Sequence, residues 1–209
     1  MKVMLKKVRV AFTQALLVPA DYQDNKVFRR SATLLVAPGS ENDKAIWAAI
    51  KSVCADVYGK KADATLEGLK GNSNKFCYQD GKTKAYDGFE GMWFTAAHRK
   101  VQDGPPLLLD SDKSHLIHKN EQGTPILDES NNIQWVPGKE GRIYAGCYVN
   151  ASVDIYAQAG QNAGVRCSLI ALQFHSDGDS FSGAAKSSGD EFEDLGTGAD
   201  ADAEFDALA

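Results

Sequence analysis

The feature that most constrains the fold of this chain is a stretch of strict alternation between residues 143 and 156. Every odd position in it, from Ile143 to Ile155, carries an apolar side chain. The even positions are mostly polar or aromatic, and they are Tyr144, Gly146, Tyr148, Asn150, Ser152, Asp154 and Tyr156. Because successive side chains of a β-strand point to opposite faces, this pattern predicts a strand with one buried face and one wetter face.

Four further segments, 3–12, 27–36, 92–100 and 165–174, alternate in the same way or are rich in β-branched and aromatic residues. One helix is predicted over about 41–58, with Ser40 as its N-cap, Gly59 at its end and an apolar face of Ile46, Ile50, Val53 and Val57. Glycine, proline, asparagine and aspartate are dense between about 60 and 90 and between 102 and 141, which indicates long loops with short strands. The chain is therefore expected to be mainly β, either a small barrel of five or more strands or an α+β sheet, with one main helix.

The charge is distributed unevenly. The net charge of the 209 residues is −5, but residues 176–209 hold ten acidic side chains and one lysine, which leaves residues 1–175 with a net charge of +4. This last segment has few large apolar groups, too few to offset the entropy of ordering it. We therefore expect a folded domain over 1–175 and a disordered acidic tail over 176–209. The tail is either a solubilising segment or a docking peptide, whose tip would include Asp202, Glu204, Phe205 and Asp206.

Aromatic and basic residues recur together in the folded part. Tyr148 and its even-numbered neighbours share the wetter face of one strand, and Trp93 shares a face with Arg99 that we also expect to be the wetter one. Tyrosines on a sheet commonly pack across strands, but with basic neighbours they can form a stacking platform for bases. Under the second interpretation the DNA-binding candidates are Lys7, Arg9, Arg29, Lys82, Lys84, Trp93, Arg99, Lys100, Tyr144, Tyr148 and Tyr156.

No motif of catalysis, cofactor binding or metal binding is complete. The sequence DGKT at 80–83 resembles the end of a P-loop but lacks the earlier glycine, and His115 and His118 have no third ligand at a convincing spacing. The four cysteines lie far apart, so free thiols in a reducing compartment are expected. Nothing reads as a secretory signal or a membrane span. We therefore predict a soluble, non-enzymatic protein without cofactor or metal.

Three blocks together resemble a known family. They are VRVAF…FRRSATLLVAPGSENDKAIWAAI, then YDGFEGMWFTAAHRK, then IYAGCYVNASVDIYA…GVRCSLIALQFHSDGD. They are similar to the phage-encoded single-stranded DNA-binding proteins with an OB-like fold, over nearly all of residues 3–180. The acidic tail is a second point of likeness.

The resemblance implies a sequence-nonspecific single-strand binder that serves phage DNA replication, recombination and repair in the cytoplasm of an infected bacterium. It implies weaker binding to duplex DNA, and a tail that competes with DNA and recruits a polymerase, helicase or primase. A monomer and a homodimer both remain open. The chain departs from the family in two ways: the tail ends EFDALA rather than on an aromatic, and the helix follows the second strand instead of the third.

The alternative function is that of a phage structural or interaction protein acting through its tail. A nuclease is a third and weaker hypothesis.

Overall fold

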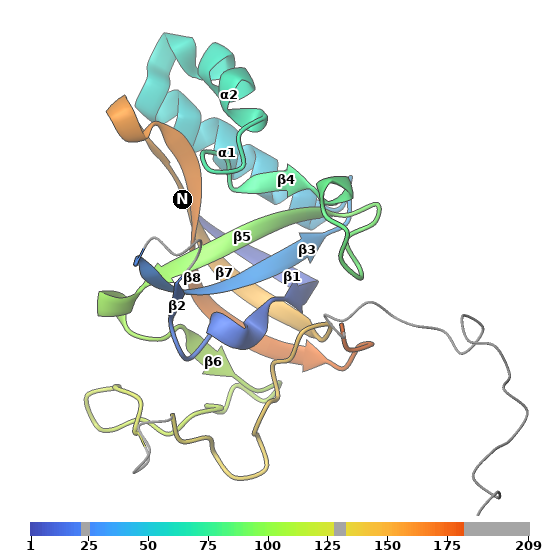
Figure 1. The fold of residues 1–209 in the computed structure, drawn as a ribbon, viewed down its shortest axis with the longest axis vertical. Helices are drawn as coiled ribbons and strands as arrows, with labels where there is room; N and C mark the ends of the chain where they lie inside the picture. Colours follow the sequence, from blue (N-terminus) through green and yellow to red (C-terminus); the bar gives the residue numbers. More distant parts are fainter. Residues whose placement is uncertain (22–25, 128–132, 182–209) are drawn as a thin grey trace, which may run out of the picture.

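Five long strands form the centre of the structure (Figure 1). The computed structural model describes residues 1–21, 26–127 and 133–181. The strands are β1 (Lys2–Ala11), β3 (Phe28–Val36), β5 (Trp93–Lys100), β7 (Tyr148–Gln158) and β8 (Gly164–Ser176). Each of them overlaps one of the five segments predicted from alternation and composition.

The five strands close into a barrel. β1 pairs antiparallel with β3 and β7, β3 pairs with β5, and β7 pairs with β8. The ring is closed by a parallel contact between β5 and β8, where His98 lies opposite Ser168. Numbered along the chain, the barrel order is 1-2-3-5-4-1, which is the arrangement of an OB-fold. The predicted mainly β, OB-like class is therefore confirmed.

Shorter elements extend this barrel. β2 (Ala20–Asp21) pairs with β3, β4 (Tyr78–Asp80) pairs with the start of β5, and β6 (Leu107–Leu109) pairs in parallel with β8. Single turns of 3-10 helix join several elements: η1 (Thr13–Ala15), η2 (Gly59–Lys61), η3 (Gly81–Thr83), η4 (Val101–Asp103) and η5 (Gly160–Asn162).

Helix α1 (Glu41–Tyr58) confirms the predicted helix and its caps. The Ser40 hydroxyl accepts a hydrogen bond from the Asp43 amide at 3.2 Å, and the Asp43 carboxylate accepts one from the Gly39 amide at 2.7 Å. This reciprocal pair satisfies amides that the first turn would otherwise leave without partners. The helix ends at Gly59, whose φ is +54°. Its buried face packs on β1 and β7, and it follows the second barrel strand, as the sequence indicated. The predicted apolar face is wrong at its last position, because Val57 is exposed.

A second helix, α2 (Ala62–Lys70), occupies part of a region that we predicted to be loop. It packs against α1 and buries only two large side chains, Leu66 and Leu69. Two leucines give too weak a periodic signal to outweigh the surrounding glycines and asparagines. The prediction of a long loop over 60–90 is therefore wrong for its first part.

Strand β7 confirms the alternation, but it is shorter than predicted. Val149, Ala151, Val153 and Ile155 are all fully buried. Residues 143–147 are outside the strand, because the chain turns at Gly146, whose φ is +107°. Tyr144 therefore does not lie on the strand face with Tyr148.

Strand β5 turns the face that we expected to be solvent-exposed towards the core. Trp93 and Ala97 belong to the main core, whereas Phe94 packs on the opposite side in a smaller cluster. The expected wetter face is thus the inner one, because helix α1 and strand β4 cover the start of β5.

No described helix is long and apolar enough to cross a membrane. All four cysteines are free thiols.

Candidate nucleic-acid interface

The outward side of β1, β3 and β5, here called the barrel face, is built by strand register. Arg9 lies opposite Leu35 and Leu35 opposite Phe94, so these three side chains form one row across the strands. At the other end of the face Arg29 lies opposite Lys100. Leu35 and Phe94 of the first row join Ala11 and Phe89 in a small buried cluster on the outside of the barrel. The face therefore carries cations at both ends, with a buried apolar cluster in and beside the Arg9 row.

The Arg29 and Lys100 pair is electrostatically unfavourable in the free protein. The two residues are directly opposite each other on neighbouring strands, and both are exposed. Neither has an ion-pair partner within residues 1–21, 26–127 and 133–181. Like charges in directly opposed positions destabilise a sheet. An anion bound between them would relieve that repulsion.

Two exposed aromatic rings stand beside the buried cluster. Phe12 and Tyr86 make an edge-to-face contact with ring centroids 5.0 Å apart, and their residues are 40% and 52% exposed. Phe12 has a φ of +53°, a left-handed conformation that is rare for a bulky residue. Both were missed as site residues, because Phe12 is only the last residue of the predicted strand 3–12 and Tyr86 lies in a predicted loop. Their only signal was the basic residues that precede each of them in the chain.

Tyr148 extends the face onto β7. It lies opposite Arg9, whose guanidinium carbon is 5.6 Å from the centre of the tyrosine ring. The Lys7 ammonium is 5.7 Å from the same ring. The structure therefore brings together three of the predicted residues, an aromatic and two cations, at the edge of the barrel face.

The segment 177–181 covers this edge. The Arg9 guanidinium donates a hydrogen bond to the Asp179 carbonyl at 2.5 Å and lies 4.2 Å from the centre of the Phe181 ring. The Tyr144 hydroxyl accepts a hydrogen bond from the Gly178 amide at 3.1 Å. A Cβ at Gly146 would stand 2.1 Å from the Asp179 carbonyl oxygen, so the close approach requires glycine there. Two predicted DNA-binding residues are thus held by the start of the predicted tail.

The remainder of that tail, including Asp202, Glu204, Phe205 and Asp206, lies outside the described residues. Phe181 itself packs against the outer cluster around Phe89 and Phe94. The first residues of the acidic segment therefore lie on the barrel rather than apart from it.

Comparison with known proteins identifies the family. The family model described as "Enterobacter phage Enc34, ssDNA-binding protein" matches residues 1–205. The chain belongs to this Enc34 family. It is also 34% identical over 198 residues to protein p50 of Acyrthosiphon pisum secondary endosymbiont phage 1, covering 93% of this chain and 94% of that protein.

Solved structures of the Enc34 family share the fold. The single-stranded DNA-binding protein from bacteriophage Enc34 in complex with ssDNA has a TM-score of 0.61 and 19% identity, over 86% of this chain and 89% of that one. The same Enc34 protein in another structure has a TM-score of 0.51 and 18% identity, over 92% and 90% of the two chains. At this level of identity the likeness establishes the OB-like architecture.

Several other predicted residues lie elsewhere in this Enc34-family chain. Arg99 donates hydrogen bonds to the backbone carbonyls of Asp103 at 2.7 Å and Gly104 at 2.8 Å, so it fastens the turn that follows β5. Tyr156 lies at the far end of β7, opposite Arg166. Trp93 and Lys84 line a cavity beneath α1 and α2, and Lys82 pairs with Asp80 beside it. The predicted set is therefore divided among the barrel face, a structural turn, a strand end and a cavity.

The incomplete motifs have structural explanations. Gly81 of the DGKT sequence is buried where its Cβ would stand 2.2 Å from the Phe89 carbonyl oxygen, so this glycine serves packing. Within the described part of the chain, no three His, Cys, Asp or Glu residues group closely enough to hold a metal ion.

Proposed function

We propose that this protein binds single-stranded DNA without sequence specificity, on the barrel face and its Tyr148 edge. The observation that carries the proposal is the exposed Arg29 and Lys100 pair, which has no carboxylate partner among the described residues and lies on the same face as exposed aromatic rings. In the OB-fold the second and third strands, here β3 and β5, form the surface that binds oligonucleotides. Membership of the Enc34 family supports the same ligand.

The chemistry of the face suits a flexible polyanion with exposed bases. Lys7, Arg9, Arg29 and Lys100 would contact phosphates, while Phe12, Tyr86 and Tyr148 would stack on bases. Stacking contributes about 1–3 kcal/mol per base and reads every base alike. Duplex DNA hides its base faces, so we expect it to bind more weakly.

The acidic tail would compete with DNA for these cations. The 177–181 segment supports this proposal, because its Asp179 carbonyl and Phe181 ring already contact the Arg9 guanidinium. DNA that reaches Arg9 has to displace the segment. The freed tail, with its tip at Asp202, Glu204, Phe205 and Asp206, would then be available to a polymerase, helicase or primase during phage DNA replication, recombination or repair. The cytoplasm of an infected bacterium is the proposed setting, for a monomer or a homodimer.

Fluorescence titration with oligo(dT) at two salt concentrations tests the proposal. Binding on the barrel face should quench the emission of Tyr86 and Tyr148, and it should weaken as salt is raised because contacted phosphates release counterions. Four cations in contact predict a slope of log K against log salt of about −3 for a single strand. Absence of quenching at low salt, with the tail removed as well, would favour a structural or interaction protein acting through its tail.

A further inference from the structure

A second candidate binding site lies beneath helices α1 and α2, apart from the barrel face. It is a cavity of about 410 Å³ whose walls include the rings of Trp47, Tyr78 and Trp93. Trp93 and Phe94 are consecutive in β5, so their side chains point to opposite sides of the sheet. Phe94 faces the outer cluster, and the cavity therefore opens on the other side of β5 from that cluster.

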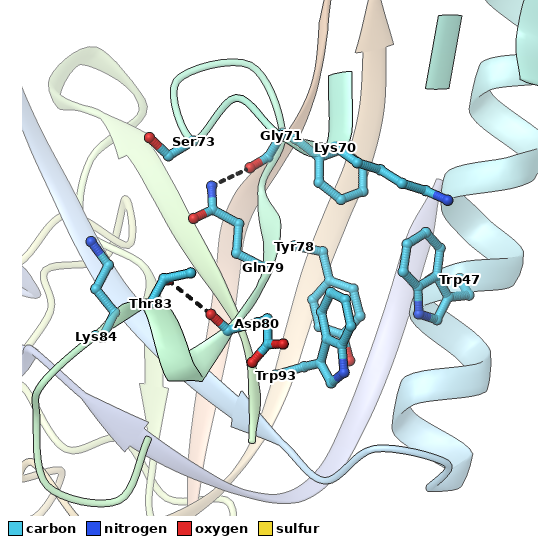
Figure 2. Close-up of a pocket in the computed structure, with 11 residues that line it drawn as sticks. Trp47, Lys70, Gly71, Ser73, Tyr78, Gln79, Asp80, Thr83, Lys84 and Trp93 are labelled. Atoms are coloured by element: carbon cyan, nitrogen blue, oxygen red, sulfur yellow. Dashed lines mark hydrogen bonds between the residues drawn. The ribbon is translucent and has the colours of Figure 1, made fainter. Parts of the chain in front are cut away.

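The aromatic walls of the cavity are fixed in place. The Tyr78 ring is fully buried, and its hydroxyl donates a hydrogen bond to Asp43 at 2.8 Å. Trp93 stacks on Tyr78 with centroids 5.3 Å apart and planes 29° apart. Trp47 meets both rings edge-on, at 5.6 and 5.9 Å. In Figure 2 the Tyr78 and Trp93 rings overlap, and Trp47 stands beside them. A flat ligand could extend this arrangement without moving the rings.

The rim of the cavity carries positive charge. Lys70 lies with its ammonium 5.3 Å from the Trp47 ring, and it also pairs with Glu67. Lys84 has no ion-pair partner among the described residues. The one carboxylate that lines the cavity, Asp80, is paired with Lys82 at 3.0 Å. Lys84 is therefore the cation most available to an incoming anion.

One loop contributes residues to both the cavity and the proposed DNA surface. The residues between β4 and β5 supply Thr83 and Lys84 to the cavity, and Tyr86 and Phe89 to the outer side of the barrel. Lys84 and Tyr86 are two residues apart, a span of at most about 7 Å. A strand that stacks on Tyr86 would thus need to advance only a short distance to reach Lys84.

We propose that this cavity takes one unstacked base of a bound single strand, with the flanking phosphate at Lys84. The proposal rests on the proposed single-strand binding and adds a second, deeper site to it. The volume lies within the range of about 300–1,000 Å³ that is usual for small-ligand pockets. Ser73, Gln79 and Thr83 supply polar groups at the walls, where a base edge or sugar could be held.

The first experiment isolates the cavity as the source of the signal. The chain has three tryptophans, and Trp135 lies outside this cavity, so a Trp135→Phe variant emits tryptophan fluorescence only from Trp47 and Trp93. We expect thymidine monophosphate and oligo(dT) to quench this emission in the full-length variant. Adding Lys84→Ala should weaken oligo(dT) binding several-fold and make the salt slope shallower by about 0.7–1. Lys113→Ala, at an exposed lysine in another loop, should leave both unchanged.

The second experiment locates the base directly. An oligo(dT) carrying halogenated uracil should cross-link under light to Trp93 or Trp47, which are partly exposed, as mapped by mass spectrometry. Ser73→Phe, at an exposed position on the rim, should block these cross-links while circular dichroism confirms an unchanged fold.

Three outcomes separate the possible failures. If labelled oligo(dT) binds by anisotropy but neither quenches the two tryptophans nor cross-links to the cavity, the base site is refuted and the barrel face stands. If oligo(dT) does not bind at all, the proposed function fails with it. If a peptide of residues 203–209 quenches the two tryptophans and nucleotides do not, the cavity holds the tail tip and the base site is refuted.

Discussion

The two ends of strand β7 carry the same residue on the same face in different surroundings. Tyr148, at the start of the strand, has the cations of Lys7 and Arg9 within 6 Å of its ring. Tyr156, at the end, lies opposite Arg166, whose guanidinium donates to the Asn74 carbonyl. Its strand neighbour Asp154 pairs with the amino terminus at 2.8 Å. The alternation places both tyrosines on one face, but only tertiary neighbours decide which of them stands in a cationic surface.

The largest expected effect comes from comparing these two tyrosines. Tyr148→Ala should weaken oligo(dT) binding by about 1–3 kcal/mol, because it removes a stacking ring between two cations. Tyr156→Ala is the matched control, about 26 Å away along the strand, and should change the affinity less than twofold. Fluorescence anisotropy with labelled oligo(dT) measures both. Equal losses of affinity in the two variants would contradict this prediction and would indicate that the bound DNA extends along β7.

A smaller effect is expected from the segment that covers Arg9. A chain ending at residue 181 loses eight acidic side chains and one lysine but keeps the 177–181 segment, whereas a chain ending at 176 also frees Arg9. Both should bind oligo(dT) several-fold more tightly at low salt, and the shorter chain more tightly than the longer. The gain should shrink as salt rises, since screening shortens the reach of the charges to about 10 Å at 0.1 M.

The two truncations separate two roles of the tail. If the chain ending at 181 binds no better than the full chain at any salt concentration, competition by the acidic residues is refuted. If the chain ending at 176 binds no better than the one ending at 181, the 177–181 segment is structural only. Circular dichroism of both chains would detect any loss of fold from removing Phe181.

The smallest effect concerns His98, which lies on β5 opposite Ser31 of β3. Burial, with Arg29 and Arg166 nearby, lowers the pKa of His98 from 6.5 to about 4. The folded state therefore binds this proton less readily than the unfolded state, and stability is lost as the pH falls from about 6.5 towards 4. His98→Gln should remove part of this loss, and the exposed His175→Gln should not. Thermal melts across this range should show a drop of about 2–4 °C for each kcal/mol lost. Parallel pH curves for the wild type and His98→Gln would contradict the assignment.

Much of the fold could be predicted from sequence because it depends on local signals. Alternation identified the five barrel strands, and Ser40 and Gly59 marked the two ends of α1. Helix α2 was missed because it buries only Leu66 and Leu69. The start of β7 was placed too early because the alternation runs on through the turn at Gly146.

The candidate site was less predictable because it depends on contacts between distant segments. Trp93 was expected on a wet face, but α1 and β4 cover that side of β5 and make it a cavity wall. Arginine is a residue type that often contacts phosphates, yet the guanidinium of Arg99 donates its hydrogen bonds to backbone carbonyls of the following turn. Phe12 and Tyr86 were missed because the chain brings them together from two loops. Their contact is visible only in three dimensions.

Amide hydrogen exchange of the full chain, with and without saturating oligo(dT), tests the location of the DNA surface most directly. The account predicts slower exchange in β1, β3, β5 and the loop 81–92, with faster exchange in 177–181 as that segment is displaced. Protection confined to residues 101–147, with β3 and β5 unchanged, would contradict the barrel face as the binding surface.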